Sequence, residues 1–227
     1  MTPEDAIVGS DEAGKGPVLG PMVAAAVRAP PEAIPENVDD SKRLAPDTRE
    51  SIAERLRAHD DVTVGVAVVS TDRIDDPETD MNSLTVDAHA EAVAAVARDG
   101  DAAVTDAGDV SESRFGRRVR EGVASASNPD SIAVDVHAEH GADETYPLVA
   151  AASVIAKVER DARIDALADE YADYGPLGSG YPSDPTTREF LSRYVGETGE
   201  LPGCARASWS TCADVLAAAE QSALSEF

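Results

Sequence analysis

The sequence predicts one α/β domain built on a mixed β-sheet. Two apolar runs, residues 6–11 and 21–29, are separated only by a glycine-rich turn, which is the pattern of two buried strands in a hairpin. After this hairpin, short apolar runs alternate with longer segments of helical pattern. Hairpin strands are antiparallel, whereas strands joined through helices run parallel, so both kinds of pairing are expected in the sheet.

The first helix and the third strand follow the hairpin. Residues 41–60 are predicted to be helical, because Pro46 stands near the first turn and the apolar Ile52 and Leu56 fall on one face. Residues 61–70 then alternate as a strand. This order brings the chain back to the sheet after one helix.

The middle of the chain repeats this alternation. Residues 81–100 are predicted to form a long helix that Gly100 closes. Two short strands follow, within residues 102–110 and 131–143, and each runs into an acidic end. Acidic residues at the ends of neighbouring strands can gather at one edge of a sheet.

The C-terminal part is predicted to be helical. Residues 146–175 read as a second long helix, and residues 175–185 read as a loop rich in glycine and proline. A short helix is expected at residues 186–195 and a terminal helix at residues 211–227. The sequence contains no internal repeat and no linker.

The composition is strongly acidic. The chain has 227 residues, with 44 Asp and Glu against 19 Lys and Arg, for a formal net charge of −25. Because the acids are spread along predicted helices and strands, a folded protein adapted to high salt is favoured over a disordered one. No apolar run approaches the roughly 18 residues of a membrane span, and the N-terminus is acidic where a secretion signal is basic. We therefore expect a soluble, cytoplasmic protein.

Three lysines remain in this acidic chain, at Lys15, Lys42 and Lys157. A chain so poor in lysine is expected to keep it where a compact cation has a use. The cysteines and histidines give weaker signals. Cys204 and Cys212 form no C-x-x-C motif and are interpreted as free thiols of a reducing compartment. The two histidines in the segment VHAEHGAD, His137 and His140, are too few to predict a zinc site.

The turn of the hairpin, GSDEAGKGP, is one residue short of the phosphate-binding P-loop pattern. A P-loop needs Ser or Thr after its lysine and a helix N-terminus behind it. Here Gly16 follows Lys15, and Pro17 leads into a strand pattern. The carboxylates of Asp11 and Glu12 would also repel a bound phosphate, so the P-loop interpretation is disfavoured.

The same carboxylates suit a divalent cation. Carboxylates that converge at strand ends can hold one or two Mg²⁺ ions, which then contact a phosphate. Asp11 and Glu12 are neighbours, so on a regular strand they point to opposite faces; they can share a site where the strand gives way to the turn, or if one ligates through its carbonyl. The candidate partners are Asp106 and Asp143, each of which follows an apolar run.

Together these segments resemble a known family. GSDEAGKGPVLGPMVAAAV, DDSKRLAP, TDAGDV, HGADETYPLVAAASVIAKVERD, GSGYPSD and SWST occur in the order found in type 2 ribonuclease H (ribonuclease HII) of the archaeal kind. The resemblance covers most of the chain. It implies a ribonuclease H-like core sheet at about residues 5–160 and a helical part at about 161–220, within one catalytic domain of residues 1–220.

The resemblance also implies an activity. The family hydrolyses the RNA strand of RNA–DNA hybrids and cuts at ribonucleotides embedded in duplex DNA, with two Mg²⁺ or Mn²⁺ ions. Its four catalytic, metal-binding acids correspond to Asp11, Glu12, Asp106 and Asp143. Two metals can activate a water and stabilise the leaving 3′-oxygen, so products with 5′-phosphate and 3′-hydroxyl ends are expected. The protein is expected to act as a monomer in replication and repair.

Substrate contacts are implied as well. The family's G-R-G turn corresponds to Gly14, Lys15 and Gly16, so lysine stands here in place of arginine and loses the planar fork. The family's ribonucleotide-sensing tyrosine corresponds to Tyr181, for which a packed loop residue is the simpler interpretation. Backbone phosphates are the expected contacts of three further cations, for which solvated surface charge is the alternative: Lys42, Arg43 and Lys157.

The last seven residues, 221–227, resemble a sliding-clamp-binding motif. Gln221, Leu224 and Phe227 have the spacing of a glutamine, an apolar plug and an aromatic on one helical turn. The chain ends after one aromatic, where the motif has two. A terminal helix that packs its apolar stripe onto the domain remains the alternative.

Two other classes of function stay open. One is a nucleic-acid-binding module without catalysis, which would not need four convergent acids. The other is a nucleoside triphosphatase, which the loop disfavours. Cleavage assays with and without Mg²⁺ separate all three.

Overall fold

A computed structural model describes residues 7–38, 44–126 and 132–225 of the chain. The chain divides into two compact units. The sheet unit comprises Met1–Ala13, Met22–Val68 and Met81–Arg160, and the helical unit comprises Gly14–Pro21, Val69–Asp80 and Asp161–Phe227. The turn after the first strand therefore belongs to a different unit from the strand itself.

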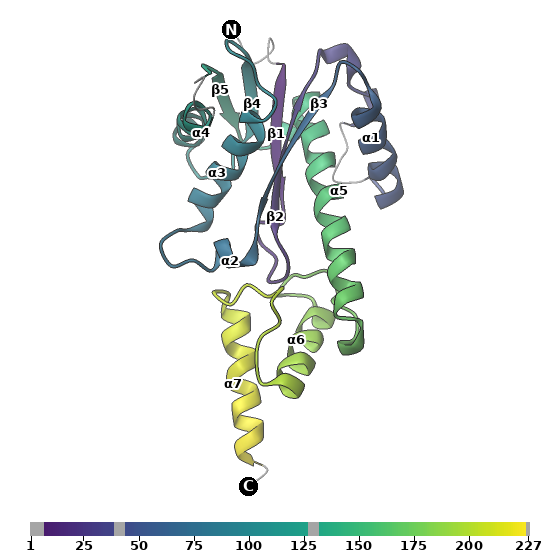
Figure 1. Cartoon of the computed structure of the whole chain (residues 1–227), viewed down its shortest axis with the longest axis vertical. Coiled ribbons are helices and arrows are strands. Elements are labelled where there is room, and N and C mark those ends of the chain that lie inside the picture. The colour runs from purple at the N-terminus through teal and green to yellow at the C-terminus, as the bar shows by residue number, and fades with distance from the viewer. Residues whose placement is uncertain (1–6, 39–43, 127–131, 226–227) are drawn as a thin grey trace. The chain divides into compact units, whose positions relative to one another are not determined.

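The sheet unit is built on five strands in the order β3-β2-β1-β4-β5 (Figure 1). The strands are β1 (Val8–Ala13), β2 (Met22–Arg28), β3 (Thr63–Val69), β4 (Ala102–Asp106) and β5 (Asp135–Glu139). β1 pairs antiparallel with β2 and parallel with β4, and β4 pairs parallel with β5. The predicted mixed sheet is confirmed.

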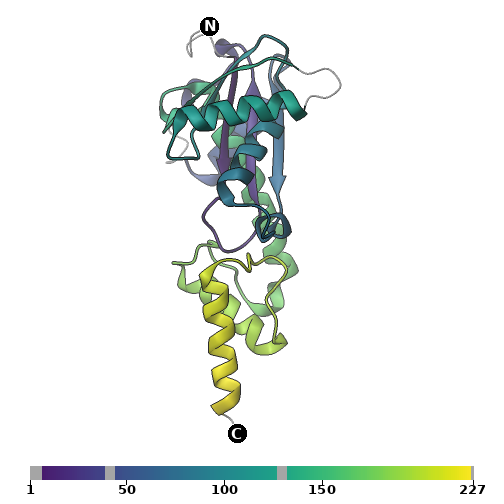
Figure 2. The same ribbon diagram turned by 90° about the vertical axis from the view of Figure 1, so that its left-hand side faces the viewer.

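Helices cover both faces of this sheet. α1 (Pro46–Ala58) and the first part of α5 (Pro147–Glu170) lie on one side, and α3 (Met81–Ala94) and α4 (Glu112–Ala126) lie on the other, as Figures 1 and 2 show. α1 begins at Pro46, after the non-helical residues 44 and 45, and so starts later than the predicted helix of residues 41–60; its buried residues are Ile52, Ala53 and Leu56. The short segments are α2 (Thr71–Ile74), η2 (Pro31–Ala33), η3 (Glu36–Val38), η4 (Ala142–Glu144) and η5 (Ala172–Tyr174).

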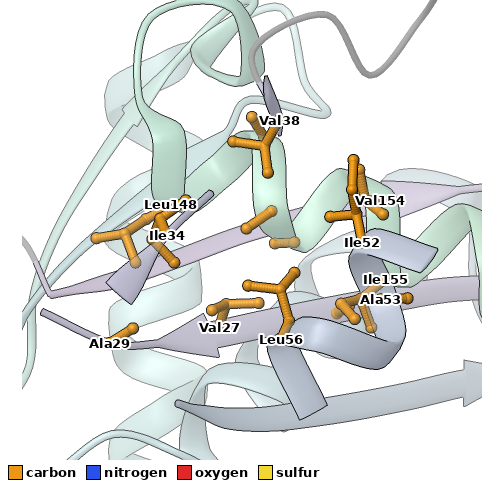
Figure 3. Close-up of a cluster of buried hydrophobic side chains, with 14 of the residues drawn as sticks. Val27, Ala29, Ile34, Val38, Ile52, Ala53, Leu56, Leu148, Val154 and Ile155 are labelled. Atoms are coloured by element: carbon orange, nitrogen blue, oxygen red, sulfur yellow. The ribbon is translucent and has the colours of Figure 1, made fainter. Parts of the chain in front are cut away.

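An aliphatic cluster joins α1 and α5 to the sheet (Figure 3). Val27 of β2, Leu56 of α1 and Ile155 of α5 are almost fully buried in it. Each such side chain stabilises the fold by about 1.5–3 kcal/mol on burial. Gly9 of β1 lets α5 approach closely, since a Cβ there would lie 2.3 Å from the backbone carbonyl carbon of Leu148. The packing therefore brings α5 directly against the strand that carries the predicted acids.

Two predicted helix ends are corrected, and one helix was not predicted. α3 ends at Ala94 instead of Gly100, which instead takes a positive φ of 84° in the turn before β4. α5 ends at Glu170, before the predicted residue 175. No helix was predicted at the position of α4, although Phe115, Val119 and Val123 recur every four residues and are buried. An apolar stripe this short is difficult to recognise in the sequence when charged residues lie between its members.

The helical unit has its own core. α6 (Pro185–Thr198) and α7 (Ser210–Ser225) enclose Phe190, Leu191 and Val215 with Val18 and Leu19 of the turn. The predicted helical C-terminal part is confirmed. Cys204 and Cys212 are free thiols, as expected, and burial raises their pKa values to about 12 and about 11. None of the helices in the described ranges is long and apolar enough to cross a membrane.

Candidate active site

Three acidic side chains converge where β1 and β4 lie side by side. Asp11 and Glu12 belong to β1, and Asp106 is the last residue of β4. Because the strands are parallel and Ser10 pairs with Thr105, the next residue of each strand lies at the same edge. One oxygen from each carboxylate lies within 4.8 Å of the other two. The expected convergence of these three acids is present.

Asp11 and Glu12 reach one another from opposite faces of β1. Asp11 points toward α5, where it is hydrogen-bonded by the hydroxyl of Ser153, and Glu12 points toward α3, where its Oε2 lies 2.9 Å from Nε2 of His89. One expected way for both residues to share a site was that the strand ends beside them, but β1 continues to Ala13. Instead its pairing with β4 stops after Ser10, and carboxylates from both faces meet in that opening.

The electrostatics of this acidic triad favour a bound cation. Asp11 is only 6% exposed, and burial together with the charge of Glu12 raises the pKa of Asp11 to about 7. Burial and the charges of Glu12 and Asp143 also raise the pKa of Asp106. A divalent cation offsets the repulsion between clustered carboxylates and so favours their ionised form. Mg²⁺ prefers oxygen ligands of this kind. The donor set therefore fits a hard divalent metal ion.

Asp143 lies beside the triad, outside the group of three. It is buried within η4, two residues after the left-handed Gly141, and not at the end of β5 as expected. The backbone N–H of Ala142 donates to Oδ1 of Asp106 at 2.8 Å, which ties η4 to β4. Burial is the main cause of the raised pKa of Asp106, and the charge of Asp143 contributes to it.

Lys157 is connected to the triad through one side chain. Its Nζ donates to Oγ of Ser153 at 2.6 Å, one turn earlier on α5, and the Ser153 hydroxyl is hydrogen-bonded to Asp11. The i and i+4 spacing places both residues on the helix face that meets β1. Sequence reasoning did not single out Ser153, whose only signal was its position in the segment AASVIAK.

The predicted substrate turn lies in the helical unit and is held by a buried arginine. Arg206 is fully buried and donates to three backbone carbonyls: those of Gly14 at 2.5 Å, Lys15 at 2.9 Å and Gly20 at 2.9 Å. Its guanidinium also lies 5.0 Å from the ring centroid of Trp209. Sequence reasoning missed Arg206, because nothing in a single sequence marks which arginine reaches a distant turn.

Tyr181 belongs to the same unit and contacts this turn. A Cβ on Gly16 would lie 3.6 Å from Cε1 of Tyr181, so the ring faces the glycine. Tyr181 is 46% exposed, so the residue is accessible. The turn leads into β2 and not into a helix, so the P-loop alternative is wrong.

Several of the other residues predicted to make contacts are not described by the structure. Lys42, Arg43 and Phe227 lie outside the described residues. α7 continues to Ser225 with Gln221 exposed, and for Leu224 only the backbone is described. Nδ1 of His140 lies 2.9 Å from Oε1 of Glu112, and Nε2 of His137 lies 3.4 Å from Oε2 of Glu139. Each histidine therefore contacts a surface acid.

Comparison with known proteins identifies relatives over nearly the whole chain. The family model described as ribonuclease HII matches residues 8–212. A ribonuclease HII from the halophilic archaeon Halobacterium salinarum is 61% identical over 220 residues, which is 96% of this chain and 98% of that protein.

Solved structures agree with this. The ribonuclease H2 of Pyrococcus horikoshii superposes with a TM-score of 0.82 at 34% identity, covering 94% of this chain and 98% of that one. The structure of a PCNA:RNase HII complex from Archaeoglobus fulgidus gives a TM-score of 0.77 at 37% identity, covering 92% and 95% of the two chains.

Proposed function

The chain belongs to the ribonuclease HII family of metal-dependent endoribonucleases, and we propose that it cuts the RNA strand of RNA–DNA hybrids and single ribonucleotides embedded in duplex DNA. The observation that carries this proposal is the convergence of Asp11, Glu12 and Asp106 at one edge of the sheet. A binding module without catalysis has no use for three carboxylates that repel one another in this way.

Asp11, Glu12, Asp106 and Asp143 are the residues that we assign to metal binding and catalysis. The first three offer oxygens close enough to share an ion, and Asp143 adds its charge from beside Asp106. When bound, two Mg²⁺ or Mn²⁺ ions supply an activated water and stabilise charge on the leaving 3′-oxygen, so the products carry 5′-phosphate and 3′-hydroxyl ends.

The neighbouring side chains hold these acids in place. The hydroxyl of Ser153 donates a hydrogen bond to Asp11, and Lys157 donates one to Ser153, so a positive charge lies two hydrogen bonds from a buried acid. The N–H of Ala142 fixes Oδ1 of Asp106. Pre-oriented ligands need no rearrangement when a metal and a phosphodiester arrive.

Recognition of the ribonucleotide is assigned to Gly14, Lys15, Gly16 and Tyr181. The 2′-hydroxyl distinguishes RNA from DNA at a given sugar, and a glycine turn lets backbone groups approach that sugar without a Cβ in the way. The aromatic ring beside Gly16 offers a surface for the next sugar. Lys15, Lys42, Arg43 and Lys157 are proposed to contact backbone phosphates, which position a duplex without reading its sequence.

A sliding clamp is the proposed protein partner. The Archaeoglobus fulgidus relative was solved as a complex with PCNA, and the C-terminus of this chain carries Gln221, Leu224 and Phe227 at the spacing of a clamp-binding peptide. We further propose that the enzyme acts in the cytoplasm as a monomer.

A cleavage assay tests the proposed activity. The substrate is a labelled DNA duplex with one ribonucleotide, and a matched all-DNA duplex serves as the control, each with and without Mg²⁺. We expect metal-dependent cuts at the ribonucleotide only, with a 5′-phosphate product, and none from the Asp106→Asn variant. Binding of the duplex without cleavage in Mg²⁺ or Mn²⁺ would instead support the non-catalytic binding module.

A further inference from the structure

His89 of α3 is a buried histidine in direct contact with the acidic triad. The side chain is fully buried, with Nδ1 2.9 Å from Oγ of Ser10 and Nε2 2.9 Å from Oε2 of Glu12. Ser10 and Glu12 are two residues apart on β1, so both side chains point to the face that α3 covers. The imidazole therefore bridges two neighbours on one strand face.

The two hydrogen bonds determine what each ring atom does. An ionised carboxylate can only accept a hydrogen bond, so Nε2 of His89 donates its N–H to Glu12. In the tautomer with its proton on Nε2, Nδ1 is an acceptor, and the hydroxyl of Ser10 is a suitable donor. Histidines that orient metal-binding groups depend on a partner at the second nitrogen in the same way.

Packing prevents this ring from turning away. Phe115 of α4 meets it edge to face, with ring centroids 5.2 Å apart and an interplanar angle of 84°. On the other side of Glu12, a Cβ at Gly108 would lie 3.4 Å from Oε1 of Glu12 and 3.4 Å from Cε2 of Phe115. The carboxylate of Glu12 thus lies between a fixed ring and the backbone after β4.

We propose that His89 is a positioning residue, which holds the carboxylate of Glu12 in the orientation that a divalent metal ion requires. This inference rests on the proposed function, because it assigns Glu12 to the metal site. Glu12 points to the α3 face, away from Asp11, and its side chain must reach around the strand edge to join Asp11 and Asp106. A hydrogen bond to Oε2 selects that conformation from the several rotamers of a glutamate.

Metal binding provides a readout that does not depend on turnover. Mn²⁺ affinity is measured by calorimetric titration and by the electron paramagnetic resonance of free Mn²⁺. His89→Leu, which keeps bulk but loses the donor, should weaken Mn²⁺ binding by about 10–100-fold, the usual effect of removing a group that orients a ligand. His89→Gln, whose amide can donate to Glu12, should recover most of the affinity. At saturating metal, kcat should fall with KM for the duplex unchanged.

A double-mutant cycle separates positioning from a structural role. In a Glu12→Gln background, His89→Leu should change Mn²⁺ affinity by less than about 2-fold, because the group that it positions is already altered. Val119→Ala is the matched control: it removes buried bulk one turn after Phe115 on α4 without changing the ring contact to His89, and should lower Tm while keeping Mn²⁺ affinity.

The opposite results overturn the proposal. Unchanged Mn²⁺ affinity in a folded His89→Leu variant, or an equal loss in both backgrounds, would leave His89 as a core residue only. If His89→Leu fails to fold, the pair His89→Gln and His89→Asn decides, since only glutamine reaches Glu12 and equal affinity in both contradicts positioning. A wild-type protein that binds Mn²⁺ but does not cleave would refute the proposed function and leave the positioning role intact.

Discussion

Oδ1 of Asp11 accepts a hydrogen bond from the backbone N–H of Glu12, the next residue of β1, at 2.7 Å. This hydrogen bond turns the carboxylate of Asp11 along the strand. The carboxylate is then directed toward the strand edge that the longer side chain of Glu12 reaches from the other face. Two consecutive strand residues can therefore serve one site, although their Cβ atoms point in opposite directions. The arrangement concentrates negative charge, and its consequences can be measured.

Removing one acid should abolish activity and stabilise the metal-free fold. Asp11→Asn, Asp106→Asn and Asp143→Asn should each lower kcat by more than about 100-fold, because loss of a ligand exceeds loss of a group that merely orients one. Each should also raise Tm in EDTA, by about 2–4 °C for each kcal/mol of repulsion relieved. Full activity in any variant would remove that residue from the site.

The raised pKa of Asp11 predicts a pH dependence of stability. Burial and Glu12 raise the pKa of Asp11 from 3.8 to about 7, so the protonated form is favoured in the folded protein. Without metal, this contribution is fully present below about pH 4 and is lost as the pH rises through 7. Urea unfolding in EDTA should therefore show lower stability at pH 8 than at pH 6, and Asp11→Asn should flatten the difference. A slope that persists in Asp11→Asn would assign it to other groups.

The substrate turn offers a contrast between binding and folding. Lys15→Ala should raise KM for a ribonucleotide-containing duplex several-fold and leave Tm unchanged. Arg206→Met should lower Tm, because it leaves the carbonyls of Gly14, Lys15 and Gly20 without their donor, and an unsatisfied buried carbonyl such as that of Gly20 costs about 1–3 kcal/mol. Duplex titrations and thermal unfolding distinguish the two variants, and an unfolded Lys15→Ala protein would indicate a structural role for that lysine.

High salt should support both folding and activity. Ordinary protein–nucleic acid complexes weaken as salt rises through counterion release, but a chain with a net charge of −25 also repels itself and its substrate. We expect circular dichroism and cleavage rates to persist or rise toward molar KCl. Best activity in dilute buffer, or loss of structure on adding salt, would contradict a halophilic adaptation.

The C-terminal residues should bind a sliding clamp without contributing to cleavage. Deletion of residues 221–227 should abolish clamp binding in a pull-down and leave cleavage of a short free duplex unchanged. Gln221→Ala should weaken clamp binding on its own, whereas the neighbouring exposed Glu220→Ala serves as the matched control. If the truncated protein unfolds, or binds the clamp as before, the prediction that these residues bind a clamp is contradicted.

The sequence alone determined most of the order of the elements and several of the residues that carry chemistry. Apolar runs and turn residues predict β1, β2 and the loop between them, because local periodicity and glycine chemistry act over a few residues. The acids at Asp11, Glu12 and Asp106 were visible for the same reason, since each stands at or near the end of an apolar run. The amphipathic α4 was missed because its apolar stripe is narrow and surrounded by charge.

Only the tertiary structure decided which of these residues meet. Asp11 and Asp106 are neighbours because β4 inserts beside β1 in the sheet, and strand order is not encoded in any local pattern. His89 reaches Glu12, and Arg206 reaches Gly14, across 77 and 192 positions of the chain. Such contacts depend on how buried faces pack against one another, and the energy that selects one packing is distributed over the whole core.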